Sequence, residues 1–187
     1  MDEITSAERL SKEGKSSYER GDYLSAARAF ETAAQSFTNA GKTLDSAEAA
    51  NNSSVAFLQA GEAEAALKAV EGTPAIFAEA GDLRRQGMAL GNRGAALEAL
   101  DRLEEAADMY QQSADILAQA GEDKLRANVM QSLSTLQLRM GRQLQALATL
   151  QAGLEGVKRP SPKQIFLKQL LRIPFQMVNK NKPSRDQ

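Results

Sequence analysis

Small and large apolar residues recur along the chain at spacings that match one face of a helix. Four comparable segments begin at positions 21, 61, 101 and 141, and the sixth place of each is alanine. Larger apolar residues follow at offsets of 4 and 11 from that alanine, which brings all three side chains to one side of an α-helix. Each segment is therefore predicted to be helical and half-buried. The set is Ala26, Ala66, Ala106 and Ala146, then Phe30, Val70, Tyr110 and Leu150, then Phe37, Phe77, Leu117 and Val157.

Glycines punctuate this pattern with a period of 40 residues. Ala-Gly occurs at 40–41, 80–81 and 120–121, and Gly21, Gly61 and Gly141 fall midway, with Asp101 replacing glycine once. Glycine readily adopts the left-handed conformation that closes a helix, so these positions predict turns. Each unit then holds a helix pair that cannot bury its apolar face alone, and neighbouring units should stack. The predicted fold is all-α: a right-handed α-solenoid of about four helix pairs plus a C-terminal capping helix.

Two stretches depart from regular helices. Positions 71–74 read Glu-Gly-Thr-Pro inside a predicted second helix, and Pro74 has no N–H to donate to the preceding turn. We expect a break or kink near Gly72, with Thr73 as a suitable helix start. The glycines at 87, 91 and 94 lie on a predicted first helix at a spacing that does not fit a phosphate-binding loop. They are expected to permit close helix contact or to open space on the helix face.

The charge is divided unevenly. Residues 158–187 hold eight basic side chains and one acid, a net charge of +7, so residues 1–157 carry 15 basic and 23 acidic groups, or −8. Because its apolar residues recur with helical spacing, residues 161–187 should form a basic, apolar helix and tail that caps the fourth repeat. Self-association into a homo-oligomer and docking on an anionic membrane surface remain alternatives. The capping or docking residues are Phe166, Leu167, Leu170, Leu171 and Ile173.

The composition argues against an enzyme. There is no cysteine and no histidine, which removes thiol nucleophiles, imidazole acid–base chemistry and the usual zinc ligands. We predict no catalytic residue, no cofactor and no metal site. The acidic start shows no secretory signal and no long uncharged apolar run exists, so a cytoplasmic protein is expected. Nucleic acid is a poor partner for the acidic residues 1–157, which lack an aromatic stacking platform.

The pattern Gly21-Asp22-Tyr23, then Ala26, Phe30 and Ala33, resembles the second half of a tetratricopeptide repeat. Gly14 and Gly94 stand where that motif places the glycine of its first helix. Four repeats fit residues 1–160, at about 7–46, 47–86, 87–126 and 127–160. The 40-residue period resembles the longer variety of kinesin light chains and soluble NSF attachment proteins.

The resemblance implies that each first helix lines a concave groove with its second, fifth, sixth and ninth places. These places hold mostly amides, with two lysines at one end, and amides can both donate to and accept from a peptide backbone. Asparagine is also a poor helix former that can bond between neighbouring helices, and this alternative stays open. Of the carboxylate clamp of chaperone-binding members, only Asn52 is matched. The predicted peptide-binding residues are Lys12, Lys15, Asn51, Asn52, Asn92, Asn128 and Gln131.

The sequence therefore predicts a scaffold without catalytic activity, whose groove binds an extended peptide or a partner protein. The alternative is a peripheral membrane adaptor, or a self-associating module, that uses the basic C-terminal helix.

Overall fold

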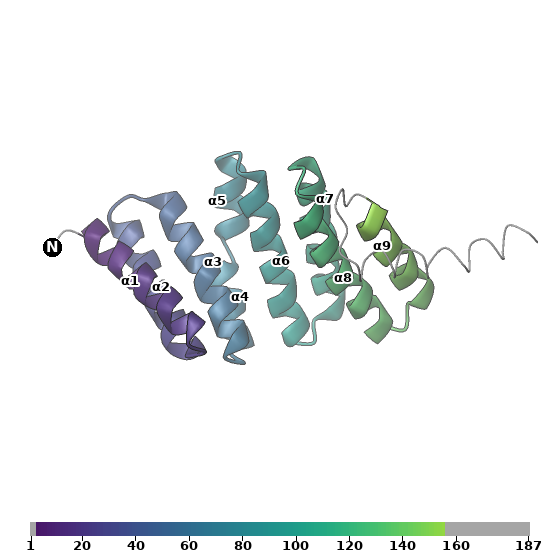
Figure 1. Cartoon of the computed structure of the whole chain (residues 1–187), viewed down its shortest axis with the longest axis horizontal. Coiled ribbons are helices and arrows are strands. Elements are labelled where there is room, and N and C mark those ends of the chain that lie inside the picture. Colours follow the sequence, from purple (N-terminus) through teal and green to yellow (C-terminus); the bar gives the residue numbers. More distant parts are fainter. Residues whose placement is uncertain (1–2, 156–187) are drawn as a thin grey trace, which may run out of the picture.

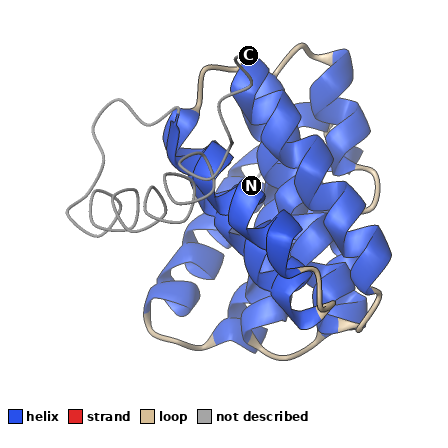
Figure 2. Ribbon diagram, turned by 90° about the vertical axis from the view of Figure 1, so that its right-hand side faces the viewer, coloured by secondary structure: helices blue, strands red, loops and turns tan. Residues whose placement is uncertain are grey.

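The computed structural model describes residues 3–155, and every regular element in this range is an α-helix (Figure 2). Figure 1 shows the helices side by side along the long axis, in the order of the sequence. None of them is long and apolar enough to cross a lipid bilayer. The helices are α1 (Glu3–Glu19), α2 (Tyr23–Asn39), α3 (Thr43–Gln59), α4 (Ala63–Val70), α5 (Thr73–Glu79), α6 (Leu83–Ala99), α7 (Leu103–Gln119), α8 (Asp123–Arg139) and α9 (Gln143–Glu155).

The helices form four pairs with a common spacing. The first helices α1, α3, α6 and α8 begin at residues 3, 43, 83 and 123, and their partners are α2, the broken helix α4–α5, α7 and α9. Each helix packs chiefly on its neighbours along the chain, as in a stacked repeat. The predicted all-helical solenoid is confirmed for these residues. The predicted repeat starts at 7, 47, 87 and 127 lie four residues inside the first helices.

The turns between helices use the left-handed backbone that their glycines allow. All six turn glycines have φ between 70° and 82°, and Asp101 takes the same conformation at φ 59°. At the end of α1, the N–H of Asp22 donates to the carbonyl of Ser17 and the N–H of Gly21 to that of Tyr18. This is the hydrogen-bond pattern of a Schellman cap, which satisfies carbonyls that the helix leaves free. The turns predicted from the 40-residue period are confirmed.

The predicted apolar face is buried as expected. Ala26, Ala66 and Ala106 have no exposed surface, and Ala146 is 1% exposed. The larger residues Phe30, Val70 and Tyr110 are buried four places later, as are Phe37, Phe77 and Leu117. Leu150 is half-buried, and Val157 lies outside the described residues. Small residues at the sixth place therefore let large side chains fill the space between helices.

Glycines on the first helices permit close packing, as predicted. A Cβ atom built at Gly14 would lie 2.9 Å from the ring of Phe30, and one at Gly94 would lie 2.9 Å from the ring of Tyr110. These two pairs occupy equivalent places in repeats one and three. Each aromatic ring thus packs against the backbone of the first helix in its own repeat.

The second repeat is interrupted where its sequence predicts. Helix α4 ends at Val70 and α5 begins at Thr73, so Gly72 lies between them at φ −92°. The hydroxyl of Thr73 donates to the carbonyl of Val70 at 3.1 Å, which satisfies one end of the broken ladder. Pro74 sits in the first turn of α5, where a missing N–H carries little cost. The break is confirmed, and it divides the second helix into two short segments.

Candidate functional site

Two hollows open between neighbouring first helices. The first hollow has a volume of about 530 Å³ and lies between α1 and α3. Its lining residues are Ser11, Lys12, Lys15, Tyr18, Phe30, Asn52 and Val55. The structure thus brings three of the predicted binding residues, Lys12, Lys15 and Asn52, to one site. The second hollow, of about 440 Å³, is lined by Glu98, Asn128, Gln131, Ser132 and Thr135, and contains two more.

The floor of the first hollow is aromatic. Phe30 is 7% exposed and reaches the hollow because Gly14 presents no side chain to its ring. Tyr18 is half-buried and its ring meets that of Tyr23 edge to face, with centroids 5.2 Å apart. Edge-to-face pairs of this kind hold their rings in place. The site therefore offers a preformed apolar surface rather than one that a ligand must assemble.

The rim of the first hollow carries two cations without a partner. The side chains of Lys12 and Lys15 are exposed, and neither forms an ion pair or hydrogen bond within residues 3–155. The nearby acid Glu13 is engaged by Arg9 at 3.4 Å. Residues three apart on a helix are neighbours on its surface, so the two ammonium groups reinforce one positive field.

The second hollow is polar where the first is apolar. The Tyr110 hydroxyl donates to Glu98 at 2.9 Å, and Arg139 donates to the other carboxylate oxygen of Glu98 at 2.7 Å. Burial raises the pKa of the Tyr110 phenol, and the neighbouring carboxylate raises that pKa further. Glu98 is thus engaged from two sides, while Asn128 and Gln131 remain exposed.

Between the two hollows the amides bond to each other. The Nδ2 group of Asn92 donates to Oδ1 of Asn51 at 3.0 Å, and Asn51 is buried at 8% exposure. Asn51 is thus largely covered and the pair joins α3 to α6, while ligand binding by these two amides stays a prediction. The contact is the alternative that the sequence left open for these asparagines, a hydrogen bond between neighbouring helices. Among these amides, Asn128 and Gln131 are exposed, and Asn52 is half-buried in the lining of the first hollow.

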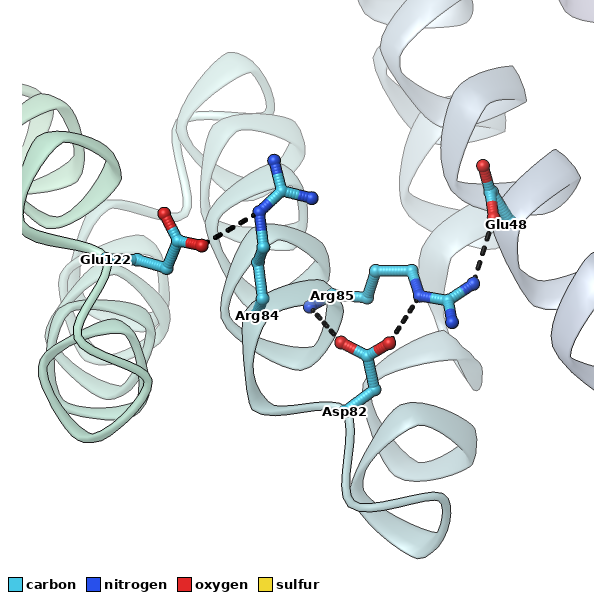
Figure 3. A network of polar contacts seen from close by, with 5 residues as sticks. All are labelled: Glu48, Asp82, Arg84, Arg85 and Glu122. Atoms are coloured by element: carbon cyan, nitrogen blue, oxygen red, sulfur yellow. Dashed lines mark hydrogen bonds and ion pairs between the residues drawn. The ribbon is translucent and has the colours of Figure 1, made fainter.

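A network of ion pairs joins successive repeats (Figure 3). Arg85 of α6 donates to Asp82 at 2.6 Å and to Glu48 of α3 at 2.9 Å. Arg84, the next residue, points the other way and meets Glu122 before α8 at 3.1 Å. The Arg85 guanidinium also lies 5.2 Å from the centre of the Phe77 ring. These charges satisfy one another, so the network links repeats and offers little to a ligand.

Sequence reasoning missed this network, although a signal was present. Arg85 stands 37 places after Glu48, and Arg84 stands 38 places before Glu122, close to one repeat. The backbone N–H and guanidinium of Arg85 lower the pKa of Asp82 below its usual 3.8. Asp82 also caps α6, since its side chain accepts from the N–H of Arg85.

The predicted capping or docking residues of the C-terminal helix, from Phe166 to Ile173, lie outside the described residues. The open end of the described array shows two large apolar residues, with Leu138 55% and Leu144 85% exposed.

Comparison with known proteins identifies the repeat. The profile of the tetratricopeptide repeat matches residues 85–159, which run from α6 through α9. No curated protein matches the chain significantly. The match assigns no variety within the family, so the likeness to the longer repeats stays a resemblance. The two pairs before the match repeat its 40-residue spacing and buried alanines. Residues 85–159 are thus tetratricopeptide repeats, a family whose repeats generally mediate binding between proteins.

Proposed function

We propose that this protein is a scaffold without catalytic activity that holds an extended segment of a partner protein along α1, α3, α6 and α8. The observation that carries the proposal is the pair of hollows at equivalent places of the repeat. Tyr18, Asn52 and Val55 of the first hollow correspond to Glu98, Ser132 and Thr135 of the second, 80 residues later. A single chain segment that contacts both hollows must run along the first helices.

The amides that line the two hollows support an extended ligand. Asn52 lies in the first hollow, and Asn128 and Gln131 lie in the second. A primary amide offers two donors and an acceptor, so it can pair with both polar groups of a peptide unit. Such contacts hold a backbone without selecting side chains, and selection is left to the hollows.

Site-specific photo-crosslinking tests the proposal in the protein's native cells. A benzoylphenylalanine residue replaces Val55 or Thr135 at the hollows, and Thr32 or Asp115 on the exposed surface of α2 or α7 as matched controls. We expect the two hollow positions to form adducts with the same partner, identified by mass spectrometry, and the control positions to form none. Adducts that arise only from the controls, in variants with wild-type helicity, would refute the assignment of the binding face.

A further inference from the structure

The two hollows offer opposite chemistry at equivalent positions. The first presents the rings of Tyr18 and Phe30 beside the aliphatic Val55. The second replaces these three by Glu98, Tyr110 and Thr135, and the Glu98 carboxylate accepts from the Tyr110 hydroxyl at 2.9 Å. An apolar side chain would therefore lose water favourably in the first hollow and would face polar groups in the second.

The size of the first hollow fits a large side chain. Its volume of about 530 Å³ lies within the range of sites that bury small organic groups. The aromatic floor is held from below, because Phe30 packs on Gly14 and Tyr18 packs on Tyr23. A bulky aliphatic or aromatic residue can thus enter without rearranging the helices.

The charge at the rim points to an acidic neighbour. The ammonium groups of Lys12 and Lys15 have no acid partner among residues 3–155, whereas arginines 85, 102, 139 and 142 are all paired with acids. In the second hollow the Glu98 carboxylate is already matched by Arg139 at 2.7 Å. Of the two hollows, only the apolar one therefore has lysines at its rim without an acid partner among residues 3–155, and a carboxylate on the ligand would complete them.

We propose that the first hollow binds a large apolar side chain of the partner segment, with an acidic side chain next to it in sequence that pairs with Lys12 and Lys15. This inference rests on the proposed function, since it assumes a partner segment along the first helices. It also fixes the position of that segment along the array, because its acidic and apolar residues lie against α1. The protein's own residues 158–187 are a poor occupant, since eight basic side chains there would meet two lysines.

Short peptides and the full-length chain provide the test. The probe is the hexapeptide Gly-Ser-Asp-Phe-Ser-Gly with both ends blocked, titrated into isotope-labelled protein while the signals of Asn52 and Val55 are followed by NMR. Comparison peptides replace Asp by Asn, or Phe by Ala, or carry Asn with Phe at a free C-terminus. The double variant Lys12→Gln/Lys15→Gln is compared with Lys42→Gln/Lys124→Gln, which changes the net charge equally at exposed lysines elsewhere.

We expect the Asp-Phe peptide to bind about 2- to 30-fold more tightly than its Asn analogue, because two exposed ion pairs contribute modestly. The Ala analogue should bind about 10- to 150-fold more weakly, from loss of one buried apolar side chain. The Lys12/Lys15 variant should lose the preference for Asp, and the Lys42/Lys124 variant should keep it. Raising the salt concentration should reduce the preference.

Three results would overturn the inference: equal binding of the Asp and Asn peptides, no saturable binding of the Asp-Phe peptide, or tightest binding of the peptide with a free C-terminus. The last would mean that the site reads a terminal carboxylate. The photo-crosslinks from Val55 and Thr135 judge the proposed function separately. Crosslinks from both positions without a preference for an acidic peptide would reject only the inference about the first hollow.

Discussion

Replacing Gly87 by alanine tests the close packing of α6 against α7. A Cβ atom at position 87 would lie 2.6 Å from Cγ and 2.8 Å from Cδ2 of Leu117, a fully buried side chain. Gly91, one turn later on the same helix, provides a matched control. Its Cβ atom would lie 3.2 Å from the Oγ atom of Ser113, so a shift of a few tenths of an ångström relieves the contact.

Both substitutions gain helix propensity, but only Gly87→Ala is expected to overpack the contact with Leu117. Alanine in a helix interior is more stable than glycine by about 1 kcal/mol at either position. Overpacking against Leu117 should cost about 1–3 kcal/mol at position 87 only. Gly87→Ala should therefore be less stable than Gly91→Ala by about 1–3 kcal/mol. For a chain of this size the melting temperatures should differ by about 2–12 °C.

Urea and thermal unfolding, followed by far-ultraviolet circular dichroism, measure the difference, after a check that both variants unfold in one transition. A double-mutant cycle with Leu117→Ala identifies the cause. Removing the Leu117 side chain leaves space for the new methyl group, so Gly87→Ala should become neutral or stabilising in that background. A Gly87→Ala variant at least as stable as Gly91→Ala, or an unchanged effect in the Leu117→Ala background, would contradict the packing described for these helices.

Two further predictions concern the ion-pair network and the open end of the array. Asp82→Asn removes a carboxylate whose pKa in the folded state is depressed below 3.8. The carboxylate therefore stabilises the fold above pH 3.8, and this stabilisation is lost as the pH falls through the folded-state pKa. The wild type should therefore be more stable than Asp82→Asn at about pH 6, and the difference should disappear at about pH 2. Unfolding midpoints at both pH values measure the difference. A difference that does not diminish at the lower pH would argue against stabilisation by the ionised Asp82 carboxylate. At the open end, we propose that residues 163–178 cover Leu144, and because the chain has no cysteine, a Leu144→Cys variant reports this contact directly. Its thiol should react more slowly in the full chain than in a truncation ending at residue 158, while Thr32→Cys should react equally in both, and equal rates at position 144 would favour a free docking arm.

The repeat architecture could be predicted because its determinants are local. A glycine with positive φ at the turn and alanine at the sixth place act within one helix pair, and each recurs at 40-residue spacing. The break at Gly72 is local in the same sense, since Pro74 cannot donate to the preceding turn whatever surrounds it. Asp101 shows that the backbone requirement is stronger than the residue preference, because it takes a φ of 59° with a side chain present.

The binding face could be predicted only in part. The sequence placed Asn51 and Asn92 on one side of the first helices, but their exposure depends on how closely α3 and α6 approach. Ala89, three places before Asn92, is buried in one apolar cluster with Ala47 of α3, which shows that the two helices pack closely there. Side-chain contacts between residues 37 to 41 places apart, such as Arg85 with Glu48 and Asn92 with Asn51, depend on this close packing of neighbouring first helices. A helical pattern alone does not specify the rotation and spacing on which such contacts depend.

The polar contacts of the second hollow can be followed to a single hydroxyl group. Tyr110 and Phe30 are equivalent, and both rings pack on a glycine of the first helix. The hydroxyl of Tyr110 lies in a buried side chain, so it needs an acceptor, which Glu98 provides. The Glu98 carboxylate in turn needs a cation, which Arg139 of the next repeat provides. Phe30 has no hydroxyl and requires no acceptor, Tyr18 stands at the place of Glu98, and no acid forms an ion pair with Lys12 or Lys15 among residues 3–155. The apolar floor and the unpaired lysines thus line the same hollow, so a single ligand segment can contact both.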